Sequence, residues 1–354
     1  MASEPKTYQE ELHIDYTIRL RDILKTMPEF AKDYFRAIEP NTSPKTRISY
    51  AYDIRVFFQF LLSQNPAFKN YQMKDFKPQD IESLKPQDIE EYQEYLKVYK
   101  DPDDKLITNT ETGLFRKMSS LRSFYAYYFK RQVIEKNPTL LVDMPKIHEH
   151  AIIRLETDEI ASLLEHVESC GDKLTGQAKV YYEKTKDRDL AILTLLLGTG
   201  IRVSELVGLD IQDVDFKNNG ITVTRKGGNQ MVVYFGDEVE KALRNYLETT
   251  RKAANPLPEY ENALFLSTQR RRMGVQAVEN MVKKYAQQVT PNKKITPHKL
   301  RSTYGTALYK ETGDIYLVAD VLGHKDVNTT KKHYAAIDED RRRSAANIVK
   351  LREP

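Results

Sequence analysis

The sequence predicts a mainly helical, two-domain protein of the α+β class with one small antiparallel sheet. Apolar residues recur at helical spacing through most of the 354 residues. A short alternating pattern interrupts them from Val214 to Phe235, as expected for strands that bury one face. A proline-containing stretch without periodicity, residues 138–150, separates the two helical parts. We therefore expect one domain over residues 1–146 and a second over residues 147–354.

The first domain is predicted to consist of helices with short breaks between them. Residues 8–38 have a mixed helical pattern, and a clearer amphipathic helix begins near Thr46. The hexapeptide KPQDIE occurs at 77–82 and again at 85–90; the second copy suits a helix start, and the first is expected to lengthen a loop. A helix over residues 115–131 mixes aromatic and basic side chains, which is typical of a core helix with a solvated rim or of a helix against a phosphate backbone.

The second domain is predicted to begin with a helix near Thr157. The polar residues 168–186 indicate a loop or an inserted helix, and residues 190–197 form a buried helix. The alternating segments that follow predict short antiparallel strands, with residues 226–229 as the turn between two of them. The chain returns to helices after Asp237.

The clearest helix boundaries lie near the C-terminus. Thr296 suits an N-cap, and Pro297 suits the first helical position. Gly313 ends that helix and Asp314 caps the next one, which Gly323 ends in turn. These residues therefore predict two helices joined by a corner, with a further short helix expected to follow.

Composition restricts the class of protein. There are 55 basic and 51 acidic residues, so net charge is only +4 and supports a nucleic-acid partner only weakly. Cys170 is the only cysteine, which excludes an intrachain disulfide and suits a reducing compartment. No signal-peptide pattern opens the sequence, and the apolar run at residues 191–198 is too short to span a bilayer. We expect a cytoplasmic protein without a membrane partner.

The motifs of nucleotide and metal enzymes are missing. Gly198 and Gly200 resemble the start of a dinucleotide fingerprint, but Val203 takes the place of its third glycine and no βαβ pattern follows. The sequence has no phosphate-binding loop of the Walker type and no C-x-x-C or H-E-x-x-H motif, and its histidines lack metal-ligand spacing. We therefore expect neither a cofactor nor a metal.

Five polar residues carry the remaining chemical signal: Arg202, His298, Arg301, His324 and Tyr334. Each of them alone is more often structural than catalytic. Together they fit metal-free phosphoryl transfer, because two guanidinium groups can hold the oxygens of a phosphodiester as charge spreads over them. A tyrosine hydroxyl becomes a nucleophile when a base such as histidine takes its proton, and a lysine on a hairpin can protonate the leaving oxygen.

Motifs in this order resemble the tyrosine recombinase (phage integrase) family, and most closely its Xer-type branch. They are GTGIRVSEL, the RKGGN hairpin, HKLR, LGH and a terminal HY. Upstream, TRISYAYDIRVFFQFLL and SSLRSFYAYYFKRQVIEKNP are similar to the family's helical core-binding domain. The resemblance extends from about residue 40 to residue 336. It implies that residues 1–146 bind DNA and that residues 147–354 form the catalytic domain.

The resemblance implies six catalytic residues: Arg202, Lys226, His298, Arg301, His324 and Tyr334. Arg202 and Arg301 would bind the scissile phosphate. Tyr334 would attack it and form a 3′-phosphotyrosine link.

The other three catalytic residues would handle protons and charge. His298 would assist proton transfer, and His324 would donate to the phosphate. Lys226 would protonate the 5′-oxygen, and Glu205 matches a supporting acidic position.

The implied function is site-specific DNA recombination. A homotetramer would act on two duplexes through a Holliday junction, with a clamp of two domains around each double-stranded DNA site. The implied role is resolution of chromosome dimers, with a DNA translocase as regulator. Alternatives are a mobile-element integrase with the same chemistry, a type IB topoisomerase, and a DNA-binding regulator with a decayed site.

The sequence departs from the family pattern in a few places. The hairpin is RKGGNQ rather than the commoner GKGNK, so Arg225 competes with Lys226 for the role of acid. Ser302 stands where a histidine usually follows HxLR. The segments 77–82 and 169–186 look inserted, which resembles the single-recombinase variety of Xer system. The tail after Tyr334 is expected to form a helix, packed on its own domain or exchanged with a neighbouring protomer.

Overall fold

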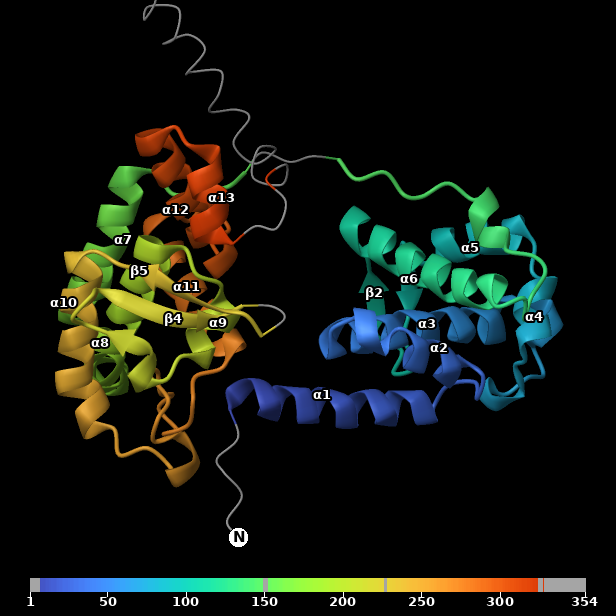
Figure 1. The fold of residues 1–354 in the computed structure, drawn as a ribbon, viewed down its shortest axis with the longest axis horizontal. Coiled ribbons are helices and arrows are strands. Elements are labelled where there is room, and N and C mark those ends of the chain that lie inside the picture. Colours follow the sequence, from blue (N-terminus) through green and yellow to red (C-terminus); the bar gives the residue numbers. More distant parts are fainter. Residues whose placement is uncertain (1–6, 149–151, 226–227, 324–326, 328–354) are drawn as a thin grey trace, which may run out of the picture. The chain divides into compact units, whose positions relative to one another are not determined.

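The computed structural model describes residues 7–148, 152–225, 228–323 and 327. The chain divides into two compact units, residues 1–150 and 151–354. The described residues are mainly helical, with one small antiparallel sheet in each unit (Figure 1). The predicted fold class is thus confirmed. None of the described helices is long and apolar enough to cross a membrane.

The first unit contains six α-helices and a two-stranded hairpin within its described part (Figure 1). In chain order these are α1 (Tyr8–Lys25), α2 (Ala31–Ala37), α3 (Pro44–Gln64), α4 (Pro78–Ser83), α5 (Pro86–Tyr95), β1 (Val98–Lys100), β2 (Leu106–Thr108) and α6 (Glu111–Lys130).

Two elements of this unit differ from expectation. The first KPQDIE copy forms the helix α4 instead of a loop. In both copies the residue before the proline donates its backbone N–H to the aspartate three positions on: Lys77 to Asp80 and Lys85 to Asp88, each over 2.7 Å. The hexapeptide therefore contains its own helix start. The hairpin β1–β2 was not expected, because its strands are only three residues long.

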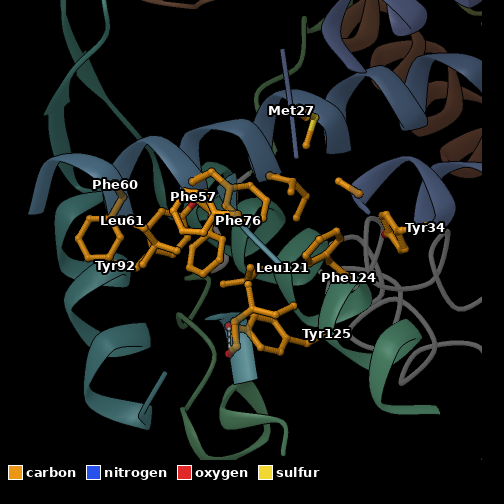
Figure 2. Close-up of a cluster of buried hydrophobic side chains, with 14 of the residues drawn as sticks. Met27, Tyr34, Phe57, Phe60, Leu61, Phe76, Tyr92, Leu121, Phe124 and Tyr125 are labelled. Carbon is orange, nitrogen blue, oxygen red and sulfur yellow. Dashed lines mark hydrogen bonds between the residues drawn. The ribbon is translucent and has the colours of Figure 1, made fainter. Parts of the chain in front are cut away.

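Aromatic side chains fill the core of the first unit, where α3 packs against α6 (Figure 2). The rings of Tyr34 and Phe124 pack edge to face, with their centroids 5.3 Å apart. Tyr125 is fully buried, and its hydroxyl donates to Ile81 O over 3.0 Å, which ties α6 to α4. Lys117 of α6 is buried as well, so α6 is a core helix along much of its length.

The second unit contains a three-stranded antiparallel sheet, ordered β3-β4-β5, and seven α-helices within its described part. Ile221 pairs with Val233 in the register of its two longer strands. The elements are α7 (Thr157–Ser169), α8 (Gly176–Thr199), α9 (Val203–Gly208), β3 (Val214–Asp215), β4 (Gly220–Thr224), β5 (Gln230–Tyr234), α10 (Asp237–Tyr246) with a π-helical turn (Leu247–Arg251), α11 (Val275–Val289), α12 (Pro297–Thr312) and α13 (Ile315–Leu322).

Helix α8 lies at the centre of this unit, against α7, α10 and α12. Residues 191–196 are buried one after another, because neighbours surround this half of the helix on all sides. Its first half is mostly exposed and explains the polar composition of residues 176–186. The segment expected to be a loop or an inserted helix is therefore a short 3-10 turn (Cys170–Lys173) followed by the first half of α8, which continues into the buried half without a break.

The helices α12 and α13 begin and end at the predicted residues. Gly313 and Gly323 adopt left-handed conformations, with φ of 72° and 60°. The side chain of Asp314 accepts from the backbone N–H groups of Tyr316 and Leu317. The further helix expected around Tyr334 and the C-terminal tail lie outside the described residues.

Candidate active site

Arg301 connects three parts of the second unit. It lies on the second turn of α12 and is only 4% exposed. Its Nη1 donates to Gly200 O over 2.6 Å, and its Nη2 donates to Leu322 O. One guanidinium therefore links the turn after α8 to the C-terminal end of α13.

Gly200 is required by the shape of that turn. It caps α8 with φ of 63°, a conformation that favours glycine. A Cβ here would lie 2.4 Å from Tyr304 Cδ1 and 2.9 Å from Leu322 Cδ2. The close approach keeps the carbonyl of Gly200 within reach of Arg301.

Arg202 follows two residues later, at the N-cap of α9. Glu205 accepts from its backbone N–H over 2.8 Å and from its Nη1 over 2.7 Å. Arg202 Nη2 donates to Gly323 O over 3.3 Å. Because Glu205 is 5% exposed, its carboxylate holds Arg202 by charge-assisted bonds away from bulk water.

The two arginines therefore meet at the end of α13, where they donate to the adjacent carbonyls of Leu322 and Gly323. The last carbonyls of a helix lack partners inside it and carry the negative end of its dipole, so they attract guanidinium groups. The turn after α8 and the α12–α13 corner, about a hundred residues apart in sequence, thus come together at one place.

A third arginine joins them. Arg225 Nη2 donates to Val321 O over 2.8 Å, so the three guanidiniums bind three successive carbonyls. Burial lowers the pKa of Arg225; Arg202 acts in the same direction, whereas Glu205 and Asp320 oppose it. We call Arg202, Arg225 and Arg301 the arginine cluster. In the sequence, Arg225 stood out only because RKGGNQ differs from the commoner GKGNK, and it was considered only as a competing candidate for the general acid.

The remaining predicted site residues are placed less completely. His298 lies on α12 three residues before Arg301, and its side chain is on the exposed side of the helix. Lys226, His324 and Tyr334 lie outside the described residues. Two of their sequence neighbours are described: Arg225 belongs to the arginine cluster, and Gly323 accepts a hydrogen bond from Arg202.

Known proteins with the same fold and sequence pattern identify the family. Residues 154–341 match the phage integrase family. The tyrosine recombinase XerC of Caldanaerobacter subterraneus subsp. tengcongensis is 33% identical over 324 residues, which cover 89% of this chain and 84% of that protein. The tyrosine recombinase XerS of Streptococcus thermophilus is 33% identical over 263 residues, covering 68% and 72%. The XerH site-specific recombinase bound to palindromic difH substrate has a similar fold, with a TM-score of 0.61 and 18% identity over 86% of this chain and 79% of that one.

The chain belongs to the phage integrase family. Its Xer relatives place it among the tyrosine recombinases, enzymes that cleave and rejoin DNA.

Proposed function

We propose that this protein is a site-specific recombinase that cleaves DNA through a covalent link between Tyr334 and a 3′-phosphate. The observation that carries this proposal is the meeting of Arg202 and Arg301 at the adjacent carbonyls of Leu322 and Gly323. Two guanidinium groups held side by side suit the non-bridging oxygens of one phosphodiester.

The chemistry follows from that arrangement. As the tyrosine oxygen approaches phosphorus, charge spreads over the non-bridging oxygens, and the two guanidiniums stabilise it. Glu205 keeps Arg202 in position before DNA arrives, so little reorganisation is needed during the reaction. His324 adds a donor to the same phosphate.

Proton transfers complete the step. His298 takes the proton of the Tyr334 hydroxyl as the new O–P bond forms. Lys226 gives a proton to the 5′-oxygen as the old P–O bond breaks, and becomes a neutral amine. Rejoining reverses both transfers, and the phosphotyrosine bond retains the energy of the phosphodiester.

The full reaction needs two DNA duplexes. We place DNA core binding in residues 1–146 and catalysis in residues 147–354, with a homotetramer that passes through a Holliday junction. The resemblance of the sequence motifs to the Xer branch is our ground for proposing resolution of chromosome dimers in the cytoplasm, with a DNA translocase as regulator. The XerH complex was obtained with a palindromic difH substrate, which supports a specific duplex site as the target.

The test is a covalent trapping experiment. Duplexes that bind the protein are selected from a random pool, and nicks are then placed along the selected site so that a cleaved fragment diffuses away. The wild-type protein is expected to form an adduct that survives denaturant, and Tyr334→Phe to form none.

Tyr316→Phe is the matched control, because Tyr316 is another tyrosine of the second unit and is 71% exposed on α13. It should form the adduct at the wild-type rate. An adduct that persists in Tyr334→Phe would show that another residue is the nucleophile. The selected sequence itself separates a chromosomal site from the ends of a mobile element.

A further inference from the structure

Arg225 lies at the base of the β4–β5 turn, immediately before Lys226. Its backbone N–H donates to Asn229 O over 2.8 Å, and its carbonyl accepts from Gly228 N over 3.0 Å. These bonds close the turn on both sides. Gly228 and Asn229 of the turn, and Gln230 at the start of β5, are exposed. The Arg225 side chain therefore connects the described part of the turn to the rest of the unit.

That side chain reaches the end of α13. Its Nη2 donates to Val321 O over 2.8 Å, across 96 positions of sequence. Its guanidinium lies against Gly323, where an added Cβ would be 1.0 Å from Nη1 and 2.1 Å from Cζ. Since Gly323 also has φ of 60°, the backbone there is shaped to receive this side chain.

The α13 end would stay in place without Arg225. Val318 and Leu322 are buried in a small core with Tyr309, and Arg301 donates to Leu322 O. In contrast, Gly228 and Asn229, the other described residues of the turn, are exposed. Loss of the guanidinium should therefore release the turn and leave the helix where it is.

Helix capping alone does not account for this arginine. The last turn of α13 already receives guanidinium donors from Arg202 and Arg301. Arg225 adds a third positive charge in a half-buried place, and its Nε is buried without a partner in the described structure. A group kept at such a desolvation cost is expected to serve a purpose beyond stability.

We propose that Arg225 is a positioning residue: it fixes the turn that carries Lys226 to the α13 end, so that the acid meets the phosphate held by Arg202 and Arg301. The proposal rests on the proposed function, in which Lys226 protonates the leaving 5′-oxygen. Arg225 itself touches neither the phosphate nor the leaving group. Its effect on the reaction comes from positioning Lys226.

The experiment compares single-turnover cleavage of two trapping substrates. One has the natural bridging 5′-oxygen and the other has sulfur there; a thiol has a pKa of about 8.5, so a thiolate leaves without a proton. Arg225→Ala is expected to lose about 10²-fold on the oxygen substrate, the lower range of general acid catalysis, and to stay within a few-fold of wild type on the sulfur substrate. Arg225→Lys keeps the positive charge and N–H donors but lacks the planar guanidinium, and it should recover part of the lost rate.

Lys226→Ala runs in parallel and separates the two ideas. If it is rescued by sulfur and Arg225→Ala is not, Arg225 acts on the phosphate or on the fold, and the positioning role is overturned. If sulfur does not rescue Lys226→Ala, the acid assignment in the proposed function fails instead. Should Arg225→Ala unfold, Arg225→Lys serves the same comparison, because its residual defect should be confined to the oxygen substrate.

Discussion

Two groups of charged side chains, one in each unit, differ in their partners. In the first unit Asp53 of α3 is 1% exposed and binds two cations of α6, Arg116 and Lys117, the latter over 3.2 Å. In the second unit Arg202 binds the carboxylate of Glu205, and all three arginines of the cluster donate to successive carbonyl oxygens at the end of α13.

The difference indicates what each group is for. The Asp53 carboxylate offsets part of the charge of Arg116 and Lys117, and it thus fastens α3 to α6 in the interior. A carbonyl holds a guanidinium in position and leaves its formal charge intact. We infer that the Asp53 group is structural, whereas Arg202 and Arg301 are arranged to meet an anion from outside.

The largest expected effect on stability is in the first unit. Asp53→Ala leaves Lys117 buried without its carboxylate, which should cost about 3 kcal/mol of local stability. Hydrogen exchange of the α3 and α6 amides should report this loss in the full-length protein. Asp22→Ala removes an exposed ion pair with Lys25 and should change exchange little.

The cleavage rate of Asp53→Ala tests whether the Asp53 group has a structural role alone. The folded fraction of Asp53→Ala should cleave the trapping substrate at the wild-type rate. A cleavage defect in excess of the folding defect would mean that the Asp53 group also serves the reaction.

A smaller effect is expected at Glu205. Glu205→Gln keeps an oxygen that can accept from Arg202 but loses the charge, so that the ion pair becomes a hydrogen bond from the guanidinium to a neutral amide. We expect a cleavage rate about tenfold lower, or about 1.4 kcal/mol. Glu159→Gln is a matched control, because Glu159 likewise accepts from a backbone N–H at a helix start and from a cation, Lys293. Equal losses of cleavage rate in the two variants would show that Glu205 has no specific role in holding Arg202 for catalysis.

Local chemistry explains what the sequence could predict. Caps such as Asp314 and Gly323 act within a few residues, so both ends of α13 could be placed without knowledge of the fold. The same reasoning failed for the first KPQDIE copy, where Asp80 was not recognised as the partner of the Lys77 N–H. The β1–β2 hairpin is too short to produce a periodic signal.

Long-range contacts explain what the sequence could not predict. Arg202 and Arg301 are 99 positions apart, and only the fold shows that they donate to neighbouring carbonyls. The contact of Arg225 with Val321 depends on a hairpin folding back onto a helix end, which no local pattern encodes. The roles assigned to Lys226, His324 and Tyr334 remain predictions.

The most direct test compares two buried arginines of the same unit. Arg251 is 7% exposed and donates to the carbonyls of Glu261 and Ala263, much as Arg301 donates to carbonyls, but it lies outside the cluster. Single-turnover cleavage should fall about 10²- to 10³-fold in Arg301→Lys, which loses the planar fork that stabilises the transition state. Arg251→Lys should lose stability and cleave within a few-fold of wild type. Similar cleavage by the two folded variants would contradict the phosphate-binding role of Arg301.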